Sequence, residues 1–227
     1  YLPDAIVNYM ALLGWSYDDK SNTLAREQLI AAFDLDRVGV APARYDEERL
    51  LWFNGYYIRQ LSPDELTSQA LPFMERAEAE GGLPDSVARP VNRAYTARVL
   101  QLEQERMKTL ADAPAMTSFF FVSALSYEPQ TLIAKHMDAA RTLDGLRRSQ
   151  ATLVALAGWD AAEMEARLRE LVAELGLKPV QLFTSLRVAV TGRTVSPPLF
   201  ETMETLGRAT SMQRIEQAIE ALAAYAG

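Results

Sequence analysis

Cysteine is absent from the 227-residue sequence, and His136 is its one histidine. Without cysteine, disulfide bonds and thiolate metal sites are excluded. One histidine is too few for a histidine-rich metal centre, and we place His136 on a helix surface. Apolar runs such as LIAAF and FFFV are too short to span a membrane, and we see no basic, cleavable leader. We therefore expect no metal site, no membrane association and a cytoplasmic location.

Recognisable catalytic motifs are missing too. The sequence has no glycine-rich phosphate loop and no Gly-x-Ser-x-Gly elbow for a serine nucleophile. The carboxylates of Asp46, Glu47 and Glu48 stand at a predicted helix start, where the helix dipole favours negative charge. We assign no catalytic residue and no cofactor to this chain.

An excess of basic charge is also lacking, because the net charge is −7. Proteins that coat nucleic acid non-specifically rely on lysine and arginine to displace counterions, so we expect no DNA binding of that kind. The stretch from Lys178 to Arg214 is nevertheless net positive. Its basic residues are suited to meet phosphate, although an ordinary solvated helix face explains the same composition.

Helical signals dominate what is present, and strand signals are sparse, so we predict an all-α fold. Pro3 suits the first turn of a helix that ends near Gly14. A second helix is expected from about Thr23, and a third after Asp46. Ser62 with Glu65 predicts a capping box that opens a helix running to Ala79.

The second half of the sequence reads in the same way. A helix is expected from about 91 to 112, ending before Pro114. Asp160 with Glu163 repeats the capping pattern, and Ser196 and Ser211 are predicted caps. FFFVSALSY at 119–127 is interpreted as a buried connector or a short helix. Further helices are predicted at about 129–157, 160–175, 178–191, 197–206 and 211–225.

Three sequence blocks carry a family resemblance: YLPDAIVNYMALLGWS at 1–16, FDLDRVGVAPARYDEERLLWFNGYYIR at 33–59, and AVTGRTVSPPLFE at 189–201. Together, and in this order, they resemble the C-terminal half of bacterial glutamyl-tRNA synthetases. The family's two ATP-binding motifs, His-Ile-Gly-His and Lys-Leu-Ser-Lys-Arg, do not occur in the chain. The resemblance therefore implies a fragment that is inactive alone, from a parent that uses ATP and magnesium to attach glutamate to tRNA.

The same resemblance implies a domain organisation and a partner. Residues 1–61 correspond to a helical stem-contact region, 62–122 to a first anticodon-binding helical domain and 123–227 to a second. Glutamate tRNA is the implied partner, and we expect a monomer. Two alternatives stay open: a helical adaptor that binds protein, and the helical cage of a related class I synthetase such as the lysyl type.

Anticodon-contacting residues are carried over from the family's pattern. RNA loops are read by stacking surfaces and by hydrogen bonds to base edges. The implied contacts to the first anticodon bases come from Arg187, Ser196, Pro197 and Leu199. Arg106 corresponds to the arginine that meets the third anticodon base and favours glutamate tRNA over glutamine tRNA. The alternatives are that Ser196 is only a helix cap and Leu199 only a core residue. For Arg106 they are a salt bridge to Glu103 or to neighbours of Glu105 across the bundle, or exposure to solvent.

The block from Asn54 to Arg59 stands close to the family's Asn-Gly-x-Tyr-Ile-Arg. We interpret Asn54, Gly55 and Tyr57 as structural residues at a joint between regions. The alternative is that Arg59 or Arg44 contacts the tRNA backbone.

Overall fold

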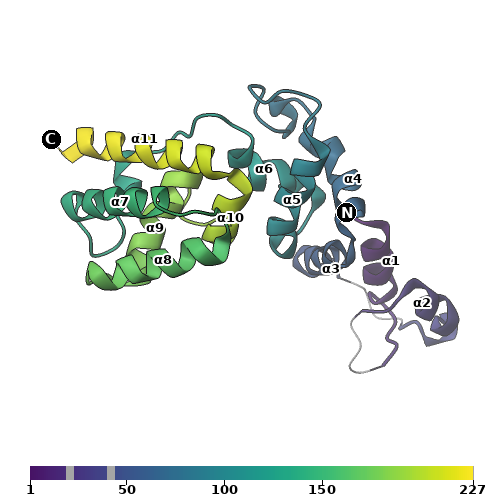
Figure 1. Cartoon of the computed structure of the whole chain (residues 1–227). Helices are drawn as coiled ribbons and strands as arrows, with labels where there is room; N and C mark the ends of the chain where they lie inside the picture. Colours follow the sequence, from purple (N-terminus) through teal and green to yellow (C-terminus); the bar gives the residue numbers. More distant parts are fainter. Residues whose placement is uncertain (19–22, 40–43, 227) are drawn as a thin grey trace. The chain divides into compact units, whose positions relative to one another are not determined.

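The computed structural model describes residues 1–18, 23–39 and 44–226, and every regular element within these ranges is helical. The prediction of an all-α fold is confirmed. The chain divides into two compact units, Tyr1–Ala115 and Met116–Gly227, whose helices are shown in Figure 1. Among the described residues, no helix is long and apolar enough to cross a membrane.

The described residues of the first unit form five longer helices and several short 3₁₀ turns. The helices are α1 (Pro3–Ala11), α2 (Arg26–Ala32), α3 (Glu47–Gln60), α4 (Pro63–Met74) and α5 (Arg93–Glu103). Helix α1 packs against α3, and α4 packs against α5. The shared core includes Phe53, Ile58 and Leu66, each with no exposed surface. Burial of such side chains is the main stabilising term for helices of this length.

Asn54 connects α3 to two other segments of the first unit. Its side-chain oxygen accepts a hydrogen bond from the Leu2 amide at 2.6 Å, and its side-chain nitrogen donates to the Lys108 carbonyl at 2.5 Å. A Cβ atom on neighbouring Gly55 would lie 3.2 Å from the Met107 carbonyl oxygen. This distance is shorter than most Cβ contacts, so a side chain at position 55 would push α3 and the 107–108 backbone apart by a few tenths of an ångström. These contacts support the structural interpretation of the Asn-Gly pair.

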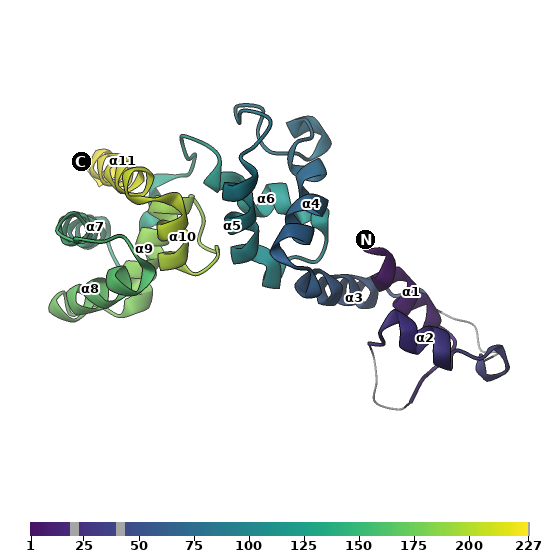
Figure 2. The same cartoon turned by 45° about the vertical axis from the view of Figure 1, so that its right-hand side comes forward.

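The second unit is a helical bundle. Its helices are α7 (Ala139–Val154), α8 (Ala161–Glu174), α9 (Pro179–Thr191), α10 (Leu199–Leu206) and α11 (Arg208–Ala226), while the short α6 (Ala113–Thr117) contains the boundary between the units. Helix α7 packs against α11, α8 and α9. Figure 2 shows α7 viewed nearly along its axis. The buried core includes Leu146, Met164 and Leu186, each fully shielded from solvent.

Several predicted helix starts are confirmed by their caps. Ser62 and Glu65 form the expected capping box, with the Ser62 amide donating to the Glu65 carboxylate at 2.8 Å. Asp46 and Asp160 each accept a backbone amide at the starts of α3 and α8. Proline opens α1 and α9. These signals are local, because a capping side chain satisfies an amide of the first turn and proline has no amide that needs a partner.

Two predicted helix ends are wrong. Helix α4 ends at Met74 rather than Ala79, because the chain turns back and the Leu83 amide donates to the Met74 carbonyl at 3.1 Å. Helix α5 ends at Glu103 rather than near Asp112. The Gln104 side chain donates to the Ile58 and Leu61 carbonyls at 2.9 Å each, which ties this point to the end of α3.

Further corrections concern the second half. Pro114 lies inside α6 instead of following a helix. Helix α7 begins at Ala139, capped by Asp138, rather than near residue 129. His136 is exposed in the loop before α7 with φ 64°, so its predicted place on a helix is wrong. Phe119 and Phe120 lie buried in a short 3₁₀ turn, in agreement with the expected connector.

Neither serine predicted as a cap in this half has that role. Helix α10 starts at Leu199 after Pro198, without a side-chain cap, so Ser196 lies outside the helix start. Ser211 is buried within α11, where its hydroxyl donates to the Met203 carbonyl at 3.2 Å. Both serines instead make bonds between elements.

Candidate functional site

Arg187 and Ser196, two residues singled out by the sequence pattern, meet at one end of α9. Arg187 Nη1 donates to Ser196 Oγ at 2.6 Å, to the Pro197 carbonyl at 2.6 Å and to the Ser196 carbonyl at 3.4 Å. Bonds from a charged donor are stronger than neutral ones. The arginine therefore fixes the loop that connects α9 to α10.

The same loop leaves α9 through a left-handed glycine. Gly192 has φ 72°, a conformation that residues with a side chain rarely adopt. Its amide donates to the Val188 carbonyl at 2.8 Å, and the Thr191 hydroxyl accepts from the Arg193 amide at 3.1 Å. These bonds shape the turn that brings Ser196 back onto Arg187.

Burial divides the predicted contact residues. Pro197 and Leu199 are buried, and Arg187 and Ser196 are partly exposed. The loop positions that face solvent are Thr194, Val195, with 67% of its surface exposed, and Pro198. Sequence reasoning missed these positions, because alternation within a short irregular loop follows no helical or strand period. Because their side chains are buried, Pro197 and Leu199 anchor the loop in this conformation.

The basic residues of the 178–214 stretch largely serve the protein's own backbone. Arg214 is only 1% exposed and donates to the Val190, Phe119 and Val122 carbonyls at 2.7–2.8 Å. Arg193 donates to the Met116 carbonyl and the Ser118 hydroxyl. Arg208 donates to two carbonyls near Trp159 and lies over its ring. The net positive charge of this stretch thus comes largely from arginines that donate hydrogen bonds within the protein, and less from cations free to bind phosphate.

Arg106 lies in the first unit, on the 3₁₀ turn that follows α5. Its Nη1 donates to Glu103 Oε2 at 2.9 Å; the Glu103 side chain is 2% exposed and that of Arg106 is 39% exposed. A buried carboxylate is costly without a charged partner. The salt bridge considered from the sequence is confirmed, and Arg106 still presents surface to solvent.

That exposed surface borders a cleft of about 420 Å³ between α3 and the 105–108 segment. Trp52, half exposed, stacks on Tyr56 with ring centroids 6.0 Å apart and planes 18° apart. Arg59 lies 3.9 Å from Glu105 across the cleft. The residues that line the cleft are Glu48, Leu51, Trp52, Gly55, Arg59, Glu105, Arg106, Met107 and Lys108. An aromatic plane flanked by cations is suited to bind an unstacked base.

Across residues 1–18, 23–39 and 44–226, no group of three or more histidine, aspartate or glutamate side chains is arranged to hold a metal ion. Burial raises the pKa of Tyr127 in the second unit and that of Tyr57 in the first. Neither phenol belongs to the two sites described above.

Known proteins share the sequence and the fold of this chain. A family model described as an anticodon binding domain matches residues 65–219. The glutamate–tRNA ligase of Roseiflexus castenholzii is 48% identical over 224 residues, which cover 99% of this chain and 43% of that protein. The glutamate–tRNA ligase of one Dehalococcoides mccartyi strain is 45% identical over 98% of this chain and 45% of its own length. The chain thus spans less than half the length of these relatives.

A solved structure shares the fold. The glutamate tRNA ligase of Elizabethkingia meningosepticum, determined in complex with its amino acid, superposes with a TM-score of 0.80 at 24% identity. The match covers 98% of this chain and 42% of that one. At this identity the likeness speaks for the fold alone.

Proposed function

Because the chain belongs to the anticodon-binding domain family, we propose that it is the tRNA-binding half of a glutamate–tRNA ligase, a class I aminoacyl-tRNA synthetase. The observation that carries the proposal is the similarity to glutamate–tRNA ligases over 99% of the chain. The partner is glutamate tRNA. The whole protein attaches glutamate with ATP and magnesium, and residues outside this chain bind both.

The loop after α9 reads the first anticodon bases in this proposal. Arg187 and Ser196 supply hydrogen-bonding groups at the loop surface, and their mutual bond of 2.6 Å supports a fixed arrangement. Fixed donors recognise a base edge at a lower entropic cost than mobile ones. Pro197 and Leu199 are buried and shape the loop. They therefore support a base contact indirectly, by fixing the conformation of the loop backbone.

Arg106 meets the third anticodon base in this proposal. The salt bridge with Glu103 limits the orientations of the guanidinium, and a rigid planar donor array distinguishes base edges better than a flexible one. The neighbouring Trp52 ring offers a stacking surface in the same cleft. Residues 1–61 then act as the stem-contact region, and 62–122 and 123–227 as the two anticodon-binding domains of a cytoplasmic monomer.

Charging of tRNA by the whole protein tests the proposal. We expect the protein to attach glutamate to glutamate tRNA and to lose most of this activity when the anticodon bases are exchanged. Charging that does not depend on the anticodon would contradict the role of this half. A whole protein that binds no tRNA, and instead carries an unrelated domain, would favour the adaptor alternative.

A further inference from the structure

The loop between α9 and α10, residues 192–198, is exposed in its middle and held on both sides. Thr194 and Val195 face solvent. On the side that leads into α10, Arg187 donates to the Ser196 hydroxyl and to the Pro197 carbonyl. These bonds do not reach the beginning of the loop, which a second arginine holds.

Arg193 makes this second attachment with its side chain. Its Nη2 donates to the Ser118 hydroxyl at 3.0 Å, and its Nη1 donates to the Met116 carbonyl at 3.3 Å. The guanidinium also lies over the Phe119 ring, 5.2 Å from its centroid, and Phe119 is buried. A planar guanidinium reaches all three partners at once, whereas a lysine ammonium is a single point charge.

The backbone at the beginning of the loop is fixed as well. The Arg193 amide donates to the Thr191 hydroxyl at 3.1 Å, and this hydroxyl donates to the Arg187 carbonyl at 2.7 Å. A Cβ atom on Gly192 would lie 3.5 Å from Cδ1 of Tyr127. The beginning of the loop therefore lies against the segment that precedes α7, within the second unit.

We propose that Arg193 is a positioning residue for the reading of the first anticodon base. It fixes the beginning of the loop on the 116–119 segment, so that the loop presents one arrangement of hydrogen-bonding groups to the base. The proposal rests on the proposed function, in which this loop reads that base. A loop that is fixed on one side only has more conformational freedom to lose on binding. Arg193 thus contributes to selectivity without contact to the RNA.

The contacts of Arg193 favour this role over direct phosphate binding. Its side chain is only partly exposed, and its donors already bind acceptors of the protein. A phosphate contact depends mainly on the positive charge, whereas fixing the loop depends on the shape of the guanidinium. Arg193→Lys separates the two roles, because it keeps the charge and loses the shape.

Binding of the whole protein to anticodon stem-loops tests the role. We expect Arg193→Lys to lower the preference for the first anticodon base of glutamate tRNA by about three- to tenfold, because a contact group that is no longer fixed must be ordered on binding. The preference at the third base should not change, because Arg106 lies in the first unit. The control Arg167→Lys lies in an exposed pair with Glu170 and should alter neither preference.

A variant without the charge distinguishes a phosphate contact. We expect Arg193→Met to lose the same first-base preference as Arg193→Lys, with an unchanged dependence of affinity on salt. A uniform loss of affinity for all stem-loops, with the salt slope smaller by about one, would assign Arg193 to a phosphate and overturn the proposal.

The partner of Arg193 gives a test that leaves the arginine in place. Ser118→Ala removes one acceptor of the guanidinium and should lower the first-base preference less than Arg193→Lys does. Because both changes act on one contact, the double variant should be no worse than Arg193→Lys alone. Losses that add in the double variant would show independent effects and overturn the proposal.

The unmodified protein separates this proposal from the proposed function. No preference for the first anticodon base in the unmodified protein would refute the proposed function, and the role of Arg193 with it. A clear preference that survives Arg193→Lys would refute the role of Arg193 and leave the proposed function intact. Equal losses at the first and third bases would show a general disturbance of the protein and would also overturn the positioning role.

Discussion

At the scale of single residues, the arginines of this chain have two structural roles. Arg214, Arg193 and Arg208 each donate to backbone carbonyls within the second unit. Arg106 and Arg187 also bind neighbouring side chains, and both remain partly exposed. Composition could not separate these groups, because it records a charge and not its partner. The motifs did identify Arg187 with Ser196, and the structure brings them into contact.

Replacing Arg214 with alanine should destabilise the second unit strongly. Three carbonyls would lose their donor in a buried site, and unsatisfied buried groups cost about 1 to 3 kcal/mol each. We expect the urea midpoint to fall by the equivalent of about 3 kcal/mol or more. Arg167→Ala is the control, since Arg167 is 57% exposed in a surface pair with Glu170 and should change stability by less than about 1 kcal/mol. Equal effects would refute the bracing role of Arg214.

Arg187→Ala should weaken the use of glutamate tRNA by about 1 to 3 kcal/mol, the usual value of an arginine contact to a base edge. The variant should remain folded but melt at a lower temperature, because the loop loses its bonds to Arg187. Arg187→Lys restores a charge without the fork geometry and should recover only part of the tRNA effect. Unchanged tRNA kinetics for Arg187→Ala, with normal folding, would remove this residue from the site.

Arg106→Gln should relax the preference for glutamate tRNA over glutamine tRNA, as measured by charging both. The substitution also leaves the buried Glu103 carboxylate without its salt bridge, so a loss of stability must be separated from a loss of recognition. The double variant Glu103→Gln/Arg106→Gln removes both charges of the pair. We expect it to regain stability and to remain unselective. Retained selectivity in the double variant would exclude Arg106 as the discriminating residue.

At the scale of helices, local signals predicted several boundaries, whereas the starts of α7 and α10 and the ends of α4 and α5 were not predicted. Serine, aspartate and proline at the first turn satisfy or avoid local amides, and Ser62, Asp46, Asp160 and Pro3 all mark real starts. The end of α5 depends instead on Gln104 reaching carbonyls more than 40 positions earlier. Such a contact exists only in the folded chain, so no local pattern announces it.

The capping box of α4 gives a pH prediction. The Ser62 hydroxyl, and then the Ser62 amide, donate to the Glu65 carboxylate and hold the pKa of this group below its ordinary value. Because the pKa of Glu65 is lowered in the folded state, its ionised form stabilises the fold at pH values above the ordinary pKa. This stabilisation is lost as the pH falls through the lowered pKa. Ser62→Ala should raise the pKa of Glu65 toward its ordinary value in an NMR titration. An unchanged pKa would show that the Ser62 hydroxyl is not the main cause.

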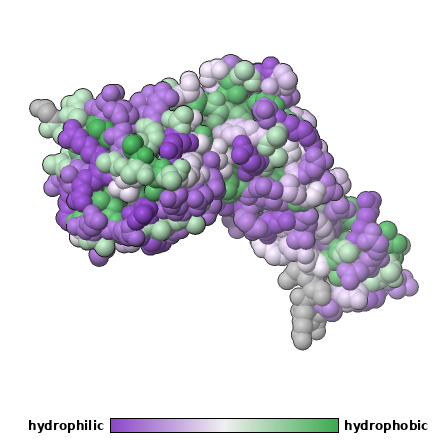
Figure 3. Space-filling model, viewed as in Figure 1, coloured by the Kyte–Doolittle hydropathy of each residue, from purple (hydrophilic) through white to green (hydrophobic). Residues whose placement is uncertain are grey.

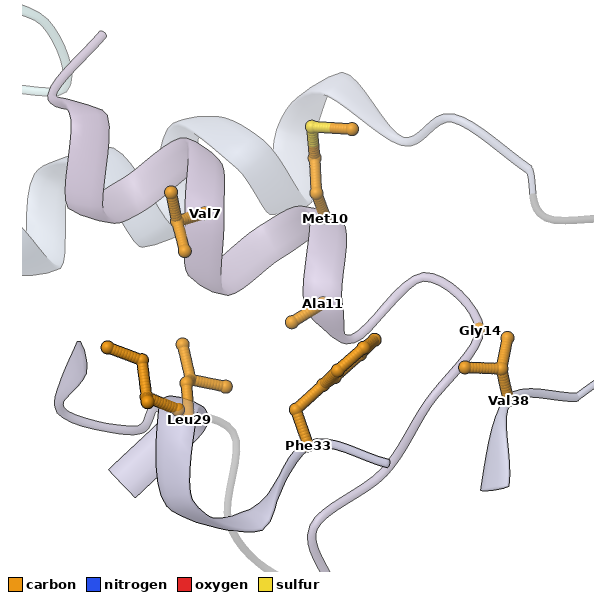
Figure 4. A pocket seen from close by; sticks show the side chains of 8 residues that line it. Val7, Met10, Ala11, Gly14, Leu29, Phe33 and Val38 are labelled. Carbon is orange, nitrogen blue, oxygen red and sulfur yellow. The ribbon is translucent and has the colours of Figure 1, made fainter. Parts of the chain in front are cut away.

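At the scale of the whole molecule, the chain has two compact units and less than half the length of its relatives. The sequence predicted the all-helical fold, because helical periodicity and caps agree along most of the chain. It also predicted the family, from three short blocks. The exposure of Met10 and Ile30 was not predicted, because it depends on the packing of α1 and α2 and not on residue type. Figure 3 shows hydrophobic residues on the visible face over these two helices. Figure 4 shows Val7 of α1 facing Leu29 of α2 across a hollow that both exposed side chains border.

A protein with only these residues should form no glutamyl-adenylate, because the chain has neither of the expected ATP-binding motifs. An ATP exchange assay measures this directly. Its tRNA affinity should be lower than that of the whole protein and should fall steeply with salt, since phosphate contacts release counterions. Adenylate formation by the purified chain would contradict the proposal that residues outside this chain bind ATP.

Binding of the whole protein to an anticodon stem-loop tests the central claim most directly. We expect it to bind the stem-loop of glutamate tRNA more tightly than the same stem-loop with exchanged first and third anticodon bases, at fixed salt. Arg106→Gln should reduce the preference at the third base, and Arg187→Ala the preference at the first. Equal affinity of the unmodified protein for the stem-loops would contradict the claim that this half of the protein reads the anticodon.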